Sequence, residues 1–273
     1  MTQATGSAGT IRRTVGTVAA MLAATALLGG CGPKSEPAAA PGTDPAASPT
    51  SSPKEVLLDA VPDGTEGVFR FTGKDASSNL TGRIDPESKA FEINTVMPPD
   101  SDGITTKISF LVIGDKIWMK AKFSGHPGLP KFPNKWMALD RSKLADSGSA
   151  PSFDGADQGN AGPLIEAATA VEEQGSGTYV GFIDVTGGEA AKALEDGEAA
   201  ALGETAKQVP FTAVVGPEQH LTSLTLRIPA AGKRKAYDYV VTYADYGSTP
   251  KITVPTGSQV TKAPAMAYEM LNG

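Results

Sequence analysis

The sequence predicts an α+β fold built mainly of antiparallel strands, with a minority of helices. Alternating, β-branched and aromatic runs dominate the chain between residues 66 and 255, and such runs are typical of strands that bury one face. Turn sequences join several of these runs, among them Gly114-Asp115 and the segments 85–89 and 216–219, as expected for hairpins. Because helical patterns are few, a large sheet with a few packed helices is the expected architecture.

Each expected element follows from its own stretch of sequence. The expected strands are, in chain order, 66–73, 80–85, 90–96, a hairpin over 106–123, 177–185, 209–216, 220–229, 236–247 and 250–255. The expected helices are 53–60, 164–174 and the Ala/Glu-rich segment 189–207. A segment as long as 55–273 can bury one sizeable core without disulfide bonds, so these elements are assigned to a single β-rich domain.

The first 30 residues have the pattern of a secretory signal peptide. Arg12 and Arg13 supply positive charge, and the uncharged, mostly apolar run 14–28 follows them. This run is shorter than the about 20 apolar residues that span a bilayer, and it fits the apolar region of a signal peptide. Residues 1–30 are therefore left out of the expected fold.

Cys31 is the only cysteine of the chain, and it follows Leu28, Gly29 and Gly30 directly. This order resembles the bacterial lipobox, in which cleavage occurs before the cysteine and a diacylglyceryl group is attached to its sulfur. An ordinary signal peptide with an incidental cysteine is the alternative, but a lone cysteine in an exported chain has no disulfide partner. We expect Cys31 to anchor the protein by lipid to the outer face of the bacterial cytoplasmic membrane.

Residues 31–54 connect the expected anchor to the domain. Six prolines stand among mainly Ala, Ser, Thr and Gly between residues 32 and 53, with no aromatic residue. Such a composition buries too little apolar surface to offset the entropy of ordering. It predicts a disordered linker.

The charge of the chain bears on its partners. Removing residues 1–30 takes away two arginines and no acidic residue, which changes the formal charge from −6 to −8. An acidic protein is a poor partner for nucleic acid. We likewise expect no electrostatic attraction to anionic lipid beyond the anchor.

The sequence offers little for catalysis. Its two histidines, His126 and His220, have no nucleophile motif nearby and do not have the spacing of metal ligands. No calcium loop and no phosphate-binding glycine motif is present. We therefore expect neither an enzyme nor a bound metal or cofactor.

Apolar faces on the expected strands are the more informative feature. A large sheet that few helices cover leaves an apolar hollow, and such hollows bind ligands. The candidate lining residues, which alternate with polar or oppositely directed neighbours, are Phe69, Phe71, Ile117, Met119, Tyr179 and Phe211. The same stripes also form ordinary cores, so a filled core remains the alternative at this point.

The order of several motifs resembles a known family. After the lipobox and linker come "LVIGDKIW", "KWMALD", "TYVGFID", "LTSLTLRIP" and "YADYGSTPKITVP". In this order the chain is similar to actinobacterial lipoproteins of the LppX/LprG type, which are LolA-like. The resemblance covers most of residues 55–260 and implies a curved antiparallel half-barrel, with helices on its concave side around an apolar cavity.

The resemblance also implies a function. Members of this family carry lipids or glycolipids outside the cytoplasmic membrane, and the family supplies no catalytic residue. We expect a membrane-anchored protein that binds or carries a lipid or glycolipid. The alternative is a non-enzymatic cell-envelope interaction or sensor module whose cavity is closed, because one fold serves different functions.

Overall fold

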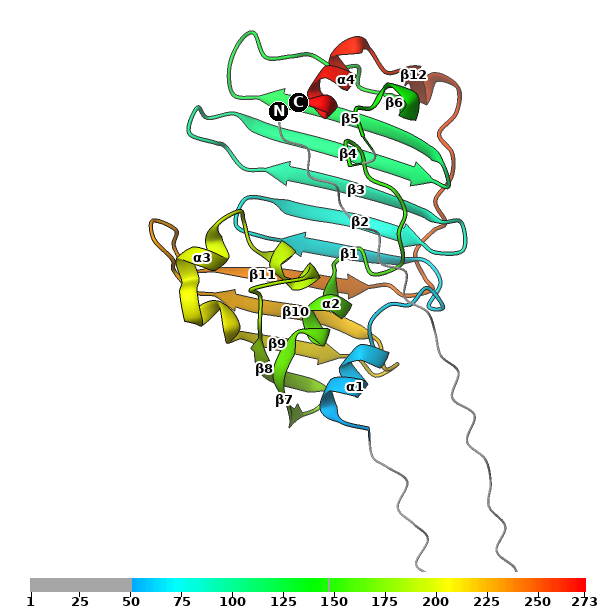
Figure 1. The fold of residues 1–273 in the computed structure, drawn as a ribbon. Coiled ribbons are helices and arrows are strands. Elements are labelled where there is room, and N and C mark those ends of the chain that lie inside the picture. The colour runs from blue at the N-terminus through cyan, green and yellow to red at the C-terminus, as the bar shows by residue number, and fades with distance from the viewer. Residues whose placement is uncertain (1–50, 147) are drawn as a thin grey trace, which may run out of the picture. The chain divides into compact units, whose positions relative to one another are not determined.

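The computed structural model describes residues 51–146 and 148–273 (Figure 1). The expected signal peptide, Cys31 and most of the expected linker lie outside the described residues. The segment Pro49–Gly273 forms one unit, and its three hydrophobic clusters consist of its own residues. A unit with its own core has what independent folding requires.

The fold is α+β, as predicted, and one sheet of twelve strands dominates it. The strand order is β12-β6-β5-β4-β3-β2-β1-β11-β10-β9-β8-β7, so the sheet is open. Neighbouring strands are antiparallel except β12 and β6, which are parallel. The strands are β1 (Phe69–Lys74), β2 (Asn79–Asp85), β3 (Ala90–Met97), β4 (Thr105–Ile113), β5 (Lys116–Ser124), β6 (Trp136–Leu139), β7 (Ala168–Gly175), β8 (Thr178–Ile183), β9 (Val209–Val215), β10 (Leu221–Ile228), β11 (Tyr237–Ala244) and β12 (Val260–Lys262).

The three predicted turns are confirmed. Segment 85–89 joins β2 to β3, Gly114 and Asp115 join β4 to β5, and segment 216–219 joins β9 to β10. Gly114 has a φ of 56°, in the left-handed region that costs glycine no steric energy. Local turn chemistry thus sets the register of these hairpins.

Helices form a minority of the structure. The α-helices are α1 (Pro53–Asp59), α2 (Ala161–Glu166), α3 (Glu198–Leu202) and α4 (Ala265–Asn272), and the 3₁₀ helices are η1 (Arg141–Lys143), η2 (Glu189–Ala193), η3 (Gly203–Lys207) and η4 (Gly257–Gln259). The predicted first helix is confirmed as α1. Ser52 and Glu55 form a capping box at its start, which satisfies backbone N–H groups that have no partner inside the helix.

Three sequence predictions are wrong. The expected helix 164–174 ends at Glu166, because the residues from Ala168 onward pair with β8 as strand β7. The expected helix 189–207 is divided into η2, α3 and η3, with Gly197 and Gly203 at positive φ. Segment 250–255 pairs with no strand, but Ile252 is buried against Trp118 in a small cluster.

The register of the strands shows which side chains share a face. Direct partners in antiparallel strands lie on the same side of a sheet. One line of such partners runs Tyr243, Phe71, Gly82, Ile93, Phe110 and Met119, from β11 to β5. We call the face that carries this line the inner face and the opposite one the outer face. Helices α1, α2 and α4 bury Leu57, Leu164 and Ala267 in clusters with inner-face residues.

Candidate functional site

The six residues predicted to line a cavity all belong to the inner face. Phe69 and Phe71 on β1 alternate along one strand, as do Ile117 and Met119 on β5, and the pairings of β8 and β9 place Tyr179 and Phe211 on the same side. None of the six is more than 5% exposed. Five of them belong to the largest hydrophobic cluster, whereas Met119 packs in another cluster with Met137 and Ala267 of α4.

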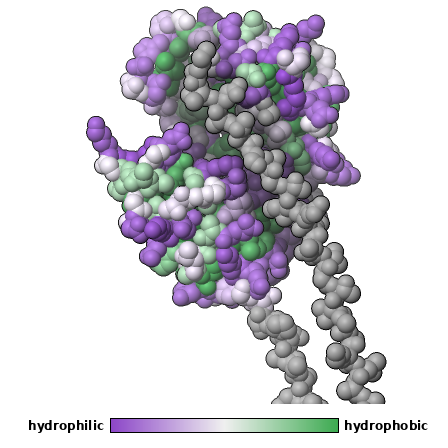
Figure 2. Space-filling view, in the orientation of Figure 1, coloured by the Kyte–Doolittle hydropathy of each residue, from purple (hydrophilic) through white to green (hydrophobic). Residues whose placement is uncertain are grey.

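Beside the large cluster the inner face carries apolar side chains that are only partly buried. Leu80, Ile93, Phe110 and Leu139 pack against the large cluster without being fully enclosed, and Phe110 and Leu139 also border the cluster beneath α4. In Figure 2 the surface is hollowed between the part that carries α3 and the part that carries α4, and green, hydrophobic residues are visible inside the hollow. We call these four side chains the inner strip.

One segment before α2 covers the inner face at β11. Asp157 accepts hydrogen bonds from the backbone N–H groups of Ala161 and Gly162, at 3.0 and 2.8 Å, and so satisfies the start of α2. Its carboxylate also accepts the hydroxyl of Tyr243 at 2.6 Å. Asp157 therefore connects α2 directly to the strand beneath it.

A second segment, residues 186–207, covers the inner face of β9 to β11. Its apolar residues Ala190, Ala193, Leu202 and Ala206 are buried in the large cluster. These residues are small apart from Leu202, so the segment can lie close to the sheet.

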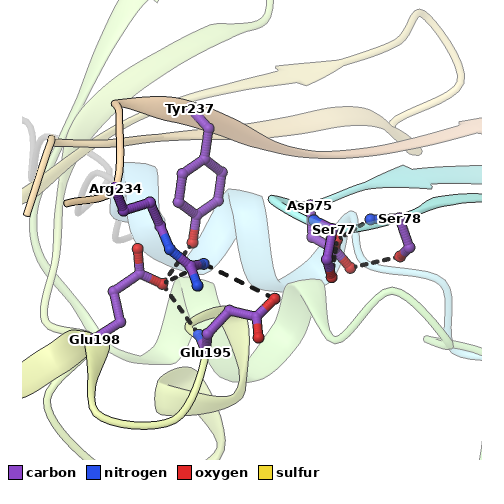
Figure 3. A network of polar contacts seen from close by, with 7 residues as sticks. All are labelled: Asp75, Ser77, Ser78, Glu195, Glu198, Arg234 and Tyr237. Carbon is purple, nitrogen blue, oxygen red and sulfur yellow. Dashed lines mark hydrogen bonds and ion pairs between the residues drawn. The ribbon is translucent and has the colours of Figure 1, made fainter. Parts of the chain in front are cut away.

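A polar network holds this segment to the turn before β11 (Figure 3). The side chain of Glu198 is 4% exposed, and its Oε2 accepts the Tyr237 hydroxyl at 2.9 Å, the Glu195 backbone N–H at 3.1 Å and Arg234 Nη1 at 3.4 Å. Arg234 also lies 3.8 Å from the carboxylate of Glu195. Among the described residues, Glu198 Oε1 has no hydrogen-bond partner.

The tyrosines of this region sit in environments that favour their neutral form. Burial, and secondarily the hydrogen bond to Glu198, raises the pKa of Tyr237 above its ordinary value. Burial raises the pKa of Tyr239 to about 12, with a smaller contribution from the charge of Asp157. Desolvation disfavours a phenolate, so these hydroxyl groups act as hydrogen-bond donors.

The network borders a small hollow. The lining includes Asp75 and Ala76 in the turn between β1 and β2, residues 192–196, Tyr237 and Tyr239, and the volume is about 340 Å³. The carboxylate of Asp75 already accepts hydrogen bonds within its own turn, from the backbone N–H groups of Ser77 and Ser78 at 2.8 and 2.6 Å (Figure 3). Polar side chains therefore line much of this hollow, which lies at one end of the inner face.

Within residues 51–146 and 148–273, no group of three or more His, Cys, Asp or Glu side chains is placed to hold a metal ion. In the same part of the chain, no helix is both long and apolar enough to cross a membrane.

Sequence reasoning missed the polar contacts that hold the covering segments. Glu198 and Arg234 are 36 residues apart, and no local pattern links them. A weaker signal existed for α4, where Met266, Ala267, Met270 and Leu271 recur at helical spacing in the tail.

No known protein family matches this chain, and comparison with curated proteins finds no match either.

Proposed function

We propose that this protein binds or carries a lipid or glycolipid on the inner face of its sheet. In this proposal the open sheet is a curved half-barrel of the LolA-like kind, and residues 186–207 cover one side of the ligand site. The chain is held at the outer face of the bacterial cytoplasmic membrane through a lipid on Cys31. The protein acts without a catalytic residue.

The inner strip is the observation that carries the proposal. A packed core encloses its large apolar side chains, but Leu80, Ile93, Phe110 and Leu139 pack against the large cluster and are only partly enclosed. An apolar hollow bordered by a few polar groups is the usual form of a site for an apolar ligand. An acyl chain on the strip would remove these side chains from water, at about 25 cal/mol for each Å² of apolar surface.

A second candidate is an interaction or sensor module with a closed cavity. It is favoured by the burial of the six candidate residues, none of which is more than 5% exposed. In that case the large cluster is an ordinary core, and the binding surface lies elsewhere.

The two candidates differ in the response to a bulky residue on the inner strip. In Ile93→Trp, the indole would occupy the space that an acyl chain needs. Val96→Trp is the matched control, because Val96 stands on the same strand, is also partly buried and faces the outer side. The probe is cis-parinaric acid, a fluorescent fatty acid, added to the delipidated domain 51–273.

We expect the unmodified domain and Val96→Trp to bind the probe and Ile93→Trp to lose it, with all three showing the same circular dichroism. If the strip is a filled core, Ile93→Trp costs about 1–3 kcal/mol of stability through overpacking, and none of the three proteins binds the probe. That second result would favour the closed module.

A further inference from the structure

A concentration of positive charge lies on β4, β5 and the loop that follows them. Residues 103–139 contain six lysines and one aspartate, a formal charge of +5, in a chain whose total is −6. The remainder of the chain therefore carries −11. Although the chain as a whole is acidic, this segment therefore carries a net positive charge.

The strand register places Lys107, Lys120 and Lys122 together on the outer face. Lys107 is the direct partner of Lys122, and Ser109 is the direct partner of Lys120. Like charges placed opposite each other destabilise a sheet, so the pair gives no folding advantage. Among the residues that the structure describes, no carboxylate lies within ion-pair distance of Lys107, Lys120 or Lys122.

These lysines border a groove that also has apolar walls. The groove has a volume of about 520 Å³, and its lining residues are Lys107, Ser109, Lys120, Ala121, Lys122, Phe123, Pro130, Lys131, Phe132, Pro133 and Asn134. No acidic residue is among them. Lys120 Nζ lies 4.2 Å from the centre of the Trp136 ring. The Trp136 side chain is partly exposed and therefore lies beside the groove.

The rest of the outer face differs from this groove. Leu111 and Trp118, on the same two strands, are buried with Ile252 of the C-terminal segment. The negative charge of Glu92, on the neighbouring strand, is paired with Arg83 at 2.8 Å. At the end of β4 and β5 that carries Lys107 and Lys122, positive charge is therefore exposed beside apolar side chains that are partly buried.

We propose that this groove, the lysine groove, docks the domain onto the anionic headgroups of a phospholipid membrane. Exposed ammonium groups are attracted to an anionic membrane surface, while phenylalanine and tryptophan side chains favour the headgroup level. A membrane fits better than a folded protein partner, because the lysines are spread over neighbouring strands without a deep apolar anchor point. This docking depends neither on the lipid anchor nor on lipid carriage, so it can fail or hold independently of the proposed function.

The test uses the domain 51–273, without the anchor, and sedimentation with vesicles. The vesicles are either pure phosphatidylcholine or phosphatidylcholine with roughly one third phosphatidylglycerol. The test variant is Lys107→Gln with Lys122→Gln. The control is Lys207→Gln with Lys251→Gln, which changes the net charge equally but removes lysines paired with Glu204 and Glu87.

We expect the domain to bind the anionic vesicles and not the neutral ones, with a blue shift of Trp136 fluorescence. Each groove lysine removed should weaken binding about fivefold, so the test variant binds roughly 25-fold more weakly while the control is unchanged. Raising the ionic strength to about 1 M, where the Debye length is about 3 Å, should release the domain. Absence of binding, equal loss in both variants, or binding of polyglutamate instead of vesicles would each overturn the membrane assignment.

Discussion

The contact between Glu198 and Arg234 allows a quantitative test of how residues 186–207 are held on the sheet. We consider Arg234→Met, which keeps much of the side chain's length and removes its charge. The change leaves the Glu198 carboxylate, which is 4% exposed, with the neutral donors Tyr237 and Glu195 N–H. Removing one partner of a fully buried ion pair costs about 3–5 kcal/mol.

The expected cost here is smaller. The side chain of Arg234 is 37% exposed, and its Nη1 lies 3.4 Å from Glu198, so water screens part of the attraction. We therefore expect Arg234→Met to lower the free energy of unfolding by about 1–2 kcal/mol. In a domain of this size that corresponds to a fall in melting temperature of about 2–4 °C for each kcal/mol.

A second substitution separates charge from shape. Glu198→Gln added to Arg234→Met removes the uncompensated charge but keeps an oxygen that can accept from Tyr237. The double variant should recover most of the lost stability in urea unfolding followed by circular dichroism. A loss below about 0.5 kcal/mol in Arg234→Met, which is the range of ordinary surface substitutions, or no recovery in the double variant would refute this account of the network.

Three further predictions concern the tyrosines, the sheet and the anchor. Burial raises the pKa of Tyr239 to about 12. The stability that the neutral Tyr239 side chain contributes is therefore complete below about pH 10 and is lost as the pH rises through about 12. Urea midpoints measured across this range should fall, and they should fall less steeply in Tyr239→Phe. Gly82→Ala should cost about 1–3 kcal/mol, because its Cβ would clash with the Glu92 carbonyl oxygen and with the Phe71 ring, whose Cζ would lie 2.9 Å away. Gly73→Ala, whose nearest contact is 3.4 Å, should cost less in the same thermal melt; equal costs would contradict the close approach of Phe71 to Gly82. After a wash at about 1 M salt, which releases electrostatically docked protein, Cys31→Ala should leave the membrane fraction or remain an uncleaved precursor, since acyl chains supply most of the remaining membrane affinity; continued fractionation with salt-washed membranes after signal removal would contradict the lipoprotein assignment.

The strands of the fold could be predicted from the sequence to a large extent. Alternation places Phe69 and Phe71 on the same face, and turn residues such as Gly114 mark where strands reverse. These signals are local, and the register of a hairpin preserves them.

The elements that depend on distant partners could not be predicted. The residues from Ala168 look helical by composition, but they lie beside β8 and pair with it as a strand, since tertiary pairing overrides local propensity. The same limit applies to the site. The alternation of β5 indicates a lysine face, but only the pairing of Lys122 with Lys107 shows that the charge is concentrated there.

The central claim is that the inner face holds a lipid, and native mass spectrometry of the protein purified from its own host tests this most directly. The account predicts a domain whose mass exceeds that of its polypeptide by a bound lipid or glycolipid, released on denaturation. The added mass should disappear in Ile93→Trp and persist in Val96→Trp. A domain recovered only at its polypeptide mass, or an added mass that both variants retain, would contradict the claim.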